Sequence, residues 1–254
     1  MSQTQTAPES VPAPPPGPQA GLFDVLLNLL VEPRTAFAEI LKSPRRFWIP
    51  MVASVVLNLA FTAVWVQKME PQQFMRNELE QSGQADKMTP DQVETVVQQQ
   101  AGIIKPISIV SGLIAAPIVA VFLGGLFYFV YRFFFGGEVT FVQSLAVVAW
   151  SALAVAVVTI PLLLVVFAVK GDWNLNPQNV VQANLSLLLD RGTTSRVLWS
   201  LAESIDLFTA WFMFLLASGF GLAIRKPTVA ALWGVVIPWA IYVVGKLGWV
   251  AVMS

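Results

Sequence analysis

The run FVQSLAVVAWSALAVAVVTIPLLLVVFAV, residues 141–169, decides the fold, because no charged side chain interrupts it. A helix needs about 20 mostly apolar residues to cross the hydrocarbon core of a bilayer. This run is longer than that, so it predicts a membrane-spanning helix. Pro161 lies inside the run and predicts a kink, because helices in membranes tolerate internal proline.

Four further apolar runs are also long enough to cross a bilayer: 47–66, 107–135, 198–224 and 229–253. Of the 254 residues, 56% are hydrophobic and only 12% are charged, whereas about 25% of the residues in a soluble protein are charged. So few charges cannot cover a surface of this size in water. The sequence therefore predicts an all-α integral membrane protein, a bundle of five transmembrane helices formed by residues 47–254.

Two segments precede the bundle. Residues 1–20 are rich in proline and glutamine and have no apolar face, so we expect a disordered tail. A proline-rich ligand for a partner protein is the alternative. Residues 21–46 predict two short amphipathic helices, the second of which begins at Pro33. Each is too short to span a bilayer, so they lie on the membrane face or dock against the bundle.

The longer loops, 67–105 and 170–197, also predict amphipathic helices that lie on the surface of the bundle. Thr89 to Gln92 form a capping-box sequence, which predicts a helix that begins there and ends near Gly102. Asn176 and the following proline predict a second helix, which buries leucines and ends at Gly192.

Basic residues give the expected orientation. Cytoplasmic loops of membrane proteins are enriched in lysine and arginine. If the five spans alternate in direction, the short loops on one side carry the basic residues Lys42, Arg45, Arg46, Arg132, Arg225 and Lys226. That side is expected to be cytoplasmic. The N-terminus is then cytoplasmic and the C-terminus lies outside.

The residue types that are missing limit the chemistry. The chain has no cysteine and no histidine, which excludes disulfides, thiolate catalysis and histidine-based triads or metal sites. Its glycine pairs lack the lysine and the strand context of a phosphate-binding loop. We therefore expect no enzymatic activity, no cofactor and no metal ion. The net charge of zero gives no reason to expect a nucleic-acid partner.

Small residues recur at four-residue intervals in the second span: Gly112, Ala116, Ala120 and Gly124. This spacing lets two helices approach closely in a membrane. The face is either a contact with a second copy or another membrane protein, or a packing face inside the bundle. Because five helices already supply neighbours, internal packing is favoured.

Besides Arg132 near the end of the second span, three charged residues fall inside predicted spans: Glu203 and Asp206 in the fourth and Lys246 in the fifth. A charge at the bilayer centre costs roughly 2.5–3.5 kcal/mol on insertion scales. The two spans are antiparallel neighbours and place these residues at similar depth, so we expect Lys246 to pair with one of the acids. Two alternatives are that Lys246 reaches the outer interface, and that the three residues form a proton or ion site.

The fourth span also carries a family resemblance. Its residues Asp206, Phe208, Trp211, Leu215 and Gly219 resemble a pattern of prokaryotic Yip (Ypt/Rab-interacting protein) domain proteins. The segments 32–37 and 44–50, before the first span, are similar to that family too. The resemblance covers about residues 21–253. It implies five spans, a cytosolic N-terminus and an outside or lumenal C-terminus.

Known catalytic residues are absent from that family, so the resemblance transfers none. Its eukaryotic members bind Rab-type GTPases, a partner that does not carry over to the cell membrane of a prokaryote. The resulting hypothesis is a non-enzymatic membrane scaffold or adaptor in contact with the lipid bilayer. A small transporter or channel component is the alternative. An enzyme ranks third, because only Glu203 and Asp206 would support it.

Overall fold

The computed structural model describes residues 21–181, 183–190 and 192–253. Within these ranges the protein is all-α, and the isolated bridge between Asn184 and Asp206 is not part of a strand. The predicted tail, residues 1–20, lies outside the described residues.

Four helices in the described part of the chain are long and apolar enough to cross a membrane: Pro44–Lys68, Pro90–Phe134, Phe141–Lys170 and Thr228–Val252. They correspond to α3 (Trp48–Lys68) with the 3₁₀ turn before it, α5 (Pro90–Phe129) with the π-helical turn Val130–Phe134, α6 (Phe141–Lys170) and α10 (Thr228–Met253). Only 17–33% of the most apolar window of each helix is buried. The remaining apolar surface requires lipid as its solvent, so the chain is a membrane protein.

The predicted fourth span, 198–224, is not one helix. The structure divides it into α8 (Arg196–Ser204) and α9 (Leu207–Ala223), with Ile205 and Asp206 between them. Asp206 has extended backbone angles and begins α9 as its N-cap. An N-cap residue cannot also continue the preceding helix, because its backbone is not helical. The expectation of one continuous helix is therefore wrong.

The second span begins much earlier than predicted. The capping box at Thr89 and Gln92 is confirmed, with Gln92 N donating to Thr89 Oγ1 over 3.3 Å. The helix does not end near Gly102, however, but continues as α5 through Pro106. Pro106 removes only one hydrogen bond, the one to the Gly102 carbonyl, and Gly102 lies in open space where that carbonyl can be hydrated.

The loop 170–197 also differs from its prediction. Asn176 caps α7 (Pro177–Val180) as expected, with Gln178 N donating to Asn176 Oδ1, but α7 is a single turn. A separate 3₁₀ turn, Leu185–Leu188, follows, and Leu188 is 82% exposed rather than buried. The predicted helix to Gly192 is therefore wrong. The backbone of residues 183–185 instead pairs with the break before α9.

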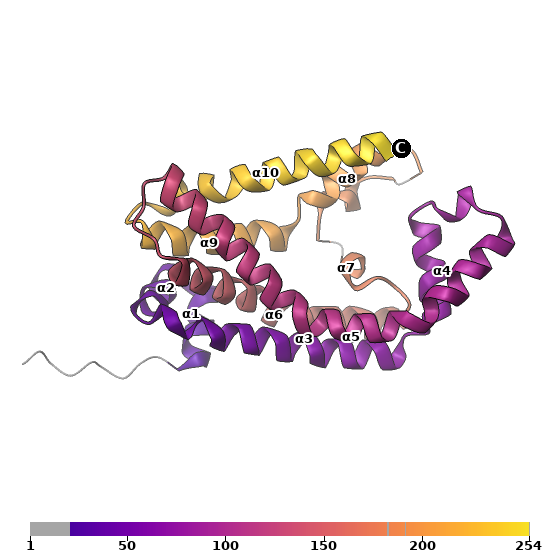
Figure 1. Ribbon diagram of the computed structural model, residues 1–254, viewed down its shortest axis with the longest axis horizontal. Helices are drawn as coiled ribbons and strands as arrows, with labels where there is room; N and C mark the ends of the chain where they lie inside the picture. The colour runs from indigo at the N-terminus through magenta and orange to yellow at the C-terminus, as the bar shows by residue number, and fades with distance from the viewer. Residues whose placement is uncertain (1–20, 182, 191, 254) are drawn as a thin grey trace, which may run out of the picture.

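The long helices run along the long axis of the molecule (Figure 1). One end carries α1 (Leu22–Val31), α2 (Pro33–Lys42) and the turns 136–140 and 225–227. We call it the basic end after Arg132, Arg225 and Lys226. Lys226 Nζ donates to the Phe135 carbonyl over 3.3 Å and so joins the two turns. The C-terminus and α4 (Pro71–Gln81) lie at the opposite end. We call it the hairpin end, because α4 packs there against the first part of α5 as a helical hairpin.

The N-terminal helices are part of the core at the basic end. Leu29 of α1 and Phe37 of α2 are fully buried, and α2 packs against α9 and α6. Arg34 Nη1 also donates to Thr228 Oγ1 over 3.1 Å, which ties α2 to the start of α10. The structure therefore places these helices against the bundle.

The face of small residues on α5 packs inside the chain. A Cβ added to Gly112 would lie 2.9 Å from Thr62 Oγ1 of α3, and one added to Gly124 would lie 3.3 Å from a Leu145 methyl of α6. Ala120 is buried, and Ala116 lines a small void between α3 and α6. This face serves the close approach of helices within the bundle, and neighbouring α3 and α6 already occupy it.

Candidate functional site

The break between α8 and α9 is held by capping at both sides. Asp206 Oδ1 accepts a hydrogen bond of 2.8 Å from Thr209 N at the start of α9. On the other side, Ile205 N donates to the Ala202 carbonyl and closes the last turn of α8. Both helix ends at the break thus have partners for groups that would otherwise be unsatisfied.

The loop between α7 and α8 supplies the remaining backbone partners. Leu185 N donates to the Ile205 carbonyl over 3.2 Å, and Leu207 N donates to the Ala183 carbonyl over 3.0 Å. Irregular backbone at membrane depth is tolerated only where its polar groups are satisfied by protein or water. The loop makes the break a stable feature of the fold rather than a frayed helix.

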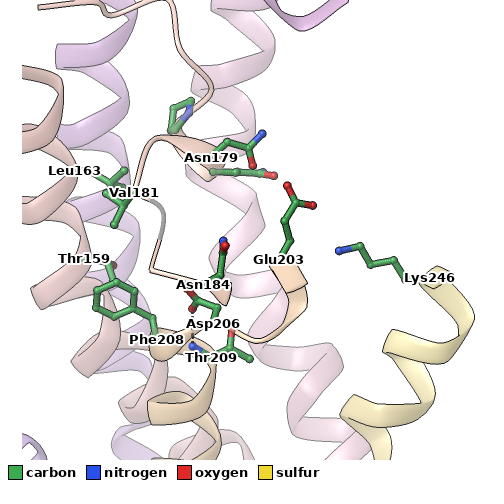
Figure 2. A pocket seen from close by; sticks show the side chains of 12 residues that line it. Thr159, Leu163, Asn179, Val181, Asn184, Glu203, Asp206, Phe208, Thr209 and Lys246 are labelled. Atoms are coloured by element: carbon green, nitrogen blue, oxygen red, sulfur yellow. Dashed lines mark hydrogen bonds between the residues drawn. The ribbon is translucent and has the colours of Figure 1, made fainter. Parts of the chain in front are cut away.

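A cavity of about 380 Å³ opens beside the break, between α6, the loop, the α8–α9 junction and α10. Figure 2 shows the side chains around it. Its lining is Thr159, Leu163, Pro177, Gln178, Asn179, Val181, Asn184, Glu203, Asp206, Phe208, Thr209 and Lys246. Small-molecule sites commonly measure roughly 300–1,000 Å³. The cavity is therefore large enough for a small ligand or a lipid headgroup.

All three charged residues of the predicted fourth and fifth spans line this cavity. Lys246 Nζ donates to Ser204 Oγ over 3.1 Å and to the Ser200 carbonyl over 3.4 Å. Glu203 Oε1 accepts from Trp199 Nε1 over 2.8 Å. Among the described residues, the ion pairs within 4.0 Å are Lys42–Glu39 and Arg76–Glu94. Direct pairing of Lys246 with an acid thus stays a prediction.

Helix lengths place the cavity close to one membrane boundary. At 1.5 Å per residue, Asp206 lies about 26 Å along α9 from the basic end, while Thr159 on α6 and Lys246 on α10 each lie about 27 Å along their helices. The hydrocarbon core is about 30 Å thick. The three helices agree on this distance, so a hydrocarbon core that began at the basic end would end near the cavity.

The sequence model of the Yip1 domain matches residues 27–250, nearly the whole chain. The chain belongs to the Yip1 domain family. The resemblance to the Yip domain family found in the sequence is thereby confirmed. No curated protein and no solved structure matches the chain.

The residues that carried the resemblance have distinct positions in this Yip1 domain. Asp206 caps α9 and Phe208 lines the cavity, whereas Trp211 packs partly buried against the core. Gly219 lies further along α9, where a Cβ would meet Val147 Cγ1 of α6 at 2.6 Å. The pattern thus combines a helix cap, a cavity wall and a point of close helix approach.

The loop residues of this Yip1 domain site were not predicted from the sequence. Asn179 and Asn184 reach the cavity only because the loop folds back over the break, which no local pattern indicates. The sequence did indicate the break itself, since Ser204 and Asp206 are good N-cap residues in front of an apolar run. Within the described residues, no group of three acidic side chains is arranged to hold a metal ion.

Proposed function

We propose that this Yip1 domain protein is a non-enzymatic membrane scaffold or adaptor with five crossings, whose partner-binding element is a helical hairpin outside the membrane. The hairpin consists of α4 and residues 90–105 of α5. A 40-residue helix is about 60 Å long, twice the hydrocarbon thickness of about 30 Å. About half of α5 therefore projects from the bundle at the hairpin end, with α4 packed against it (Figure 1).

Internal contacts favour a rigid hairpin. Phe74, Met75 and Leu79 of α4 are buried together with Val97 of α5. Arg76 Nη2 lies 2.7 Å from Glu94 Oε2 in an ion pair across the two helices.

Hydrogen bonds also fix the hairpin to the neighbouring loop. Asn77 Nδ2 donates to the Asn174 carbonyl over 3.1 Å, and Asn176 Nδ2 donates to Glu78 Oε2 over 3.0 Å. A rigid element loses little conformational entropy when it binds a partner. Its outer surface is rich in exposed amides, including Gln98, Gln99 and Gln100, which suit hydrogen bonding to a partner protein rather than contact with lipid.

The fifth crossing is part of this proposal. The α8–α9 segment connects the hairpin end to the basic end, since α8 packs against α10 and α9 runs back to the turn 225–227. A chain that crosses five times has its two termini on opposite sides. With the positive-inside rule, the N-terminal helices face the cytoplasm of a prokaryotic cell.

Site-specific photo-crosslinking in native membranes tests the scaffold role. A photoreactive residue at exposed Gln84 or Gln99 of the hairpin should give one discrete protein adduct, the same from both positions. Phe122, 68% exposed on the lipid-facing side of α5, is the matched control and should give none. The identified partner should then bind the purified protein, with weaker binding after Gln99→Lys.

The polar cavity at the broken segment favours a second candidate, a small transporter or channel component. Transporters often bind substrates at the ends of discontinuous helices. Reconstitution into liposomes discriminates between the two. Reproducible solute or ion flux, together with no discrete adduct from the hairpin, would contradict the scaffold proposal.

A further inference from the structure

The charges around the cavity come from two elements of the fold. Glu203 and Asp206 belong to the α8–α9 junction, and Lys246 approaches from α10 (Figure 2). An ammonium group has three donors, and Lys246 uses two of them, toward Ser200 and Ser204. Glu203 Oε2 and Asp206 Oδ2 accept no hydrogen bond from any described residue. The lysine and the two acids thus retain hydrogen-bonding capacity at the cavity.

A ligand with both charges would satisfy the two acids and the lysine at once. Charged groups near hydrocarbon are costly unless they are paired. A single cation would engage the two acids and leave Lys246 without a counter-charge, whereas a single anion would do the reverse. Two acids and one base around a single cavity therefore fit a zwitterion.

The donors and acceptors identify the two ends of that zwitterion. A primary ammonium has three N–H donors, which match the free carboxylate oxygens of Glu203 and Asp206 and the amide oxygen of Asn179. Lys246 supplies the positive point charge that suits a phosphate. A quaternary ammonium could not donate to the acids, and a headgroup without an ammonium would meet them with no positive charge.

The position of the cavity indicates how such a group arrives. It lies at the boundary of the hydrocarbon core, and the residues beside Asp206, Ile205 and Leu207, are 44% and 67% exposed. Trp249, 66% exposed, follows Lys246 by about one helical turn, as interfacial tryptophans do. A headgroup in the cavity would have its acyl chains beside this apolar surface.

We propose that the cavity binds a phosphoethanolamine group, with its ammonium at Glu203 and Asp206 and its phosphate at Lys246, supplied by a phosphatidylethanolamine molecule of the leaflet at the hairpin end. Free phosphoethanolamine has the same chemistry and is the other source. The site does not involve the hairpin, so a test that contradicts the lipid site leaves the scaffold proposal unaffected, and the reverse is also true.

Lipid retention provides the test. The full-length protein is purified from nanodiscs with equal amounts of phosphatidylethanolamine, phosphatidylglycerol and phosphatidylcholine, and retained lipid is measured by native mass spectrometry. Wild type should retain phosphatidylethanolamine selectively. Lys246→Gln should reduce that retention about tenfold, the size expected for one charge-assisted hydrogen bond. Lys246→Arg should restore most of it, and Glu203→Gln should reduce the preference for phosphatidylethanolamine over phosphatidylcholine.

Lys105→Gln is the matched control, since Lys105 lies on α5 away from the cavity, and it should retain lipid as wild type does. Equal retention of all three lipids by wild type, with no thermal stabilisation by free phosphoethanolamine, would overturn the proposal. So would wild-type retention by a Lys246→Gln protein that melts at the wild-type temperature. Stabilisation by free phosphoethanolamine without lipid selectivity would support the same chemistry with a soluble source.

Discussion

Phe37 of α2 lies against the backbone of Gly219 in α9, so close that a Cβ added to Gly219 would stand 3.1 Å from two ring carbons of Phe37. The same Cβ would lie 2.6 Å from Val147 Cγ1 of α6. Glycine is therefore the residue that lets three helices meet at the basic end. This contact joins the N-terminal helices to the broken fourth segment.

Gly219→Ala should lower stability by about 1–3 kcal/mol, because the added methyl group has no space between Phe37 and Val147. The midpoint of thermal unfolding in detergent measures the effect. Gly245→Ala on α10 is the matched control: nothing lies within 4 Å of a Cβ there, so it should cause no loss. Equal midpoints for the two variants would contradict the packing described for Gly219.

Two N-terminal deletions should differ sharply. Removing residues 1–20 should leave membrane insertion and the unfolding midpoint unchanged, because this sequence offers no apolar face for docking. Removing residues 21–42 should destabilise the protein, because Leu29 and Phe37 are fully buried. Equal effects of both deletions would show that the boundary at residue 20 is misplaced.

Hydropathy was sufficient to predict most of the membrane helices. The runs 47–66, 141–169 and 229–253 match α3, α6 and α10 within a few residues, because crossing a bilayer requires length and apolar composition alone. Hydropathy failed at Asp206, because this polar residue divides the run into two helices but changes the mean hydropathy of the run very little. It also missed that α5 continues from the capping box at Thr89 into the membrane, through Gly102 and Pro106.

The site could be predicted only in part. The similar depth of Glu203, Asp206 and Lys246 in neighbouring spans predicted that they lie close together, and all three line one cavity. Their hydrogen bonds to Trp199, Thr209 and the α8 serines were not predictable, since they depend on how α8 turns away from α9. Asn179 and Asn184 were missed because the folding of an irregular loop depends on tertiary contacts.

Tyr131→Phe should cost about 1 kcal/mol of stability, the usual net value of a hydrogen bond. The Tyr131 hydroxyl donates to the Ala231 carbonyl over 2.7 Å, and its buried ring stacks on Phe220. The substitution removes the hydrogen bond and keeps the ring. Tyr128→Phe is the control, because Tyr128 packs edge-on against Phe141 without a hydroxyl hydrogen bond to any described residue. A loss as large for Tyr128→Phe would refute the assignment.

Charge reversal tests the coupling of Lys246 to the acids. Lys246→Glu should lower the unfolding midpoint, because it places a third acid at the cavity. Adding Glu203→Lys should recover about 1 kcal/mol, a typical coupling energy between neighbouring residues. Adding Asp206→Lys should recover less, because it also removes the cap of α9. If neither double variant exceeds Lys246→Glu in stability, Lys246 is not coupled to these acids.

The fifth crossing through α8 and α9 is the central claim, and cysteine accessibility in intact cells tests it most directly. The chain has no cysteine of its own, so single cysteines at exposed Gln84, Glu138, Thr193 and Lys226 report four loops without background. A membrane-impermeant maleimide should label positions 84 and 193 from outside, and positions 138 and 226 only after permeabilisation. Labelling of 193 and 226 from the same side would contradict the account, because α8 and α9 would then not cross the membrane.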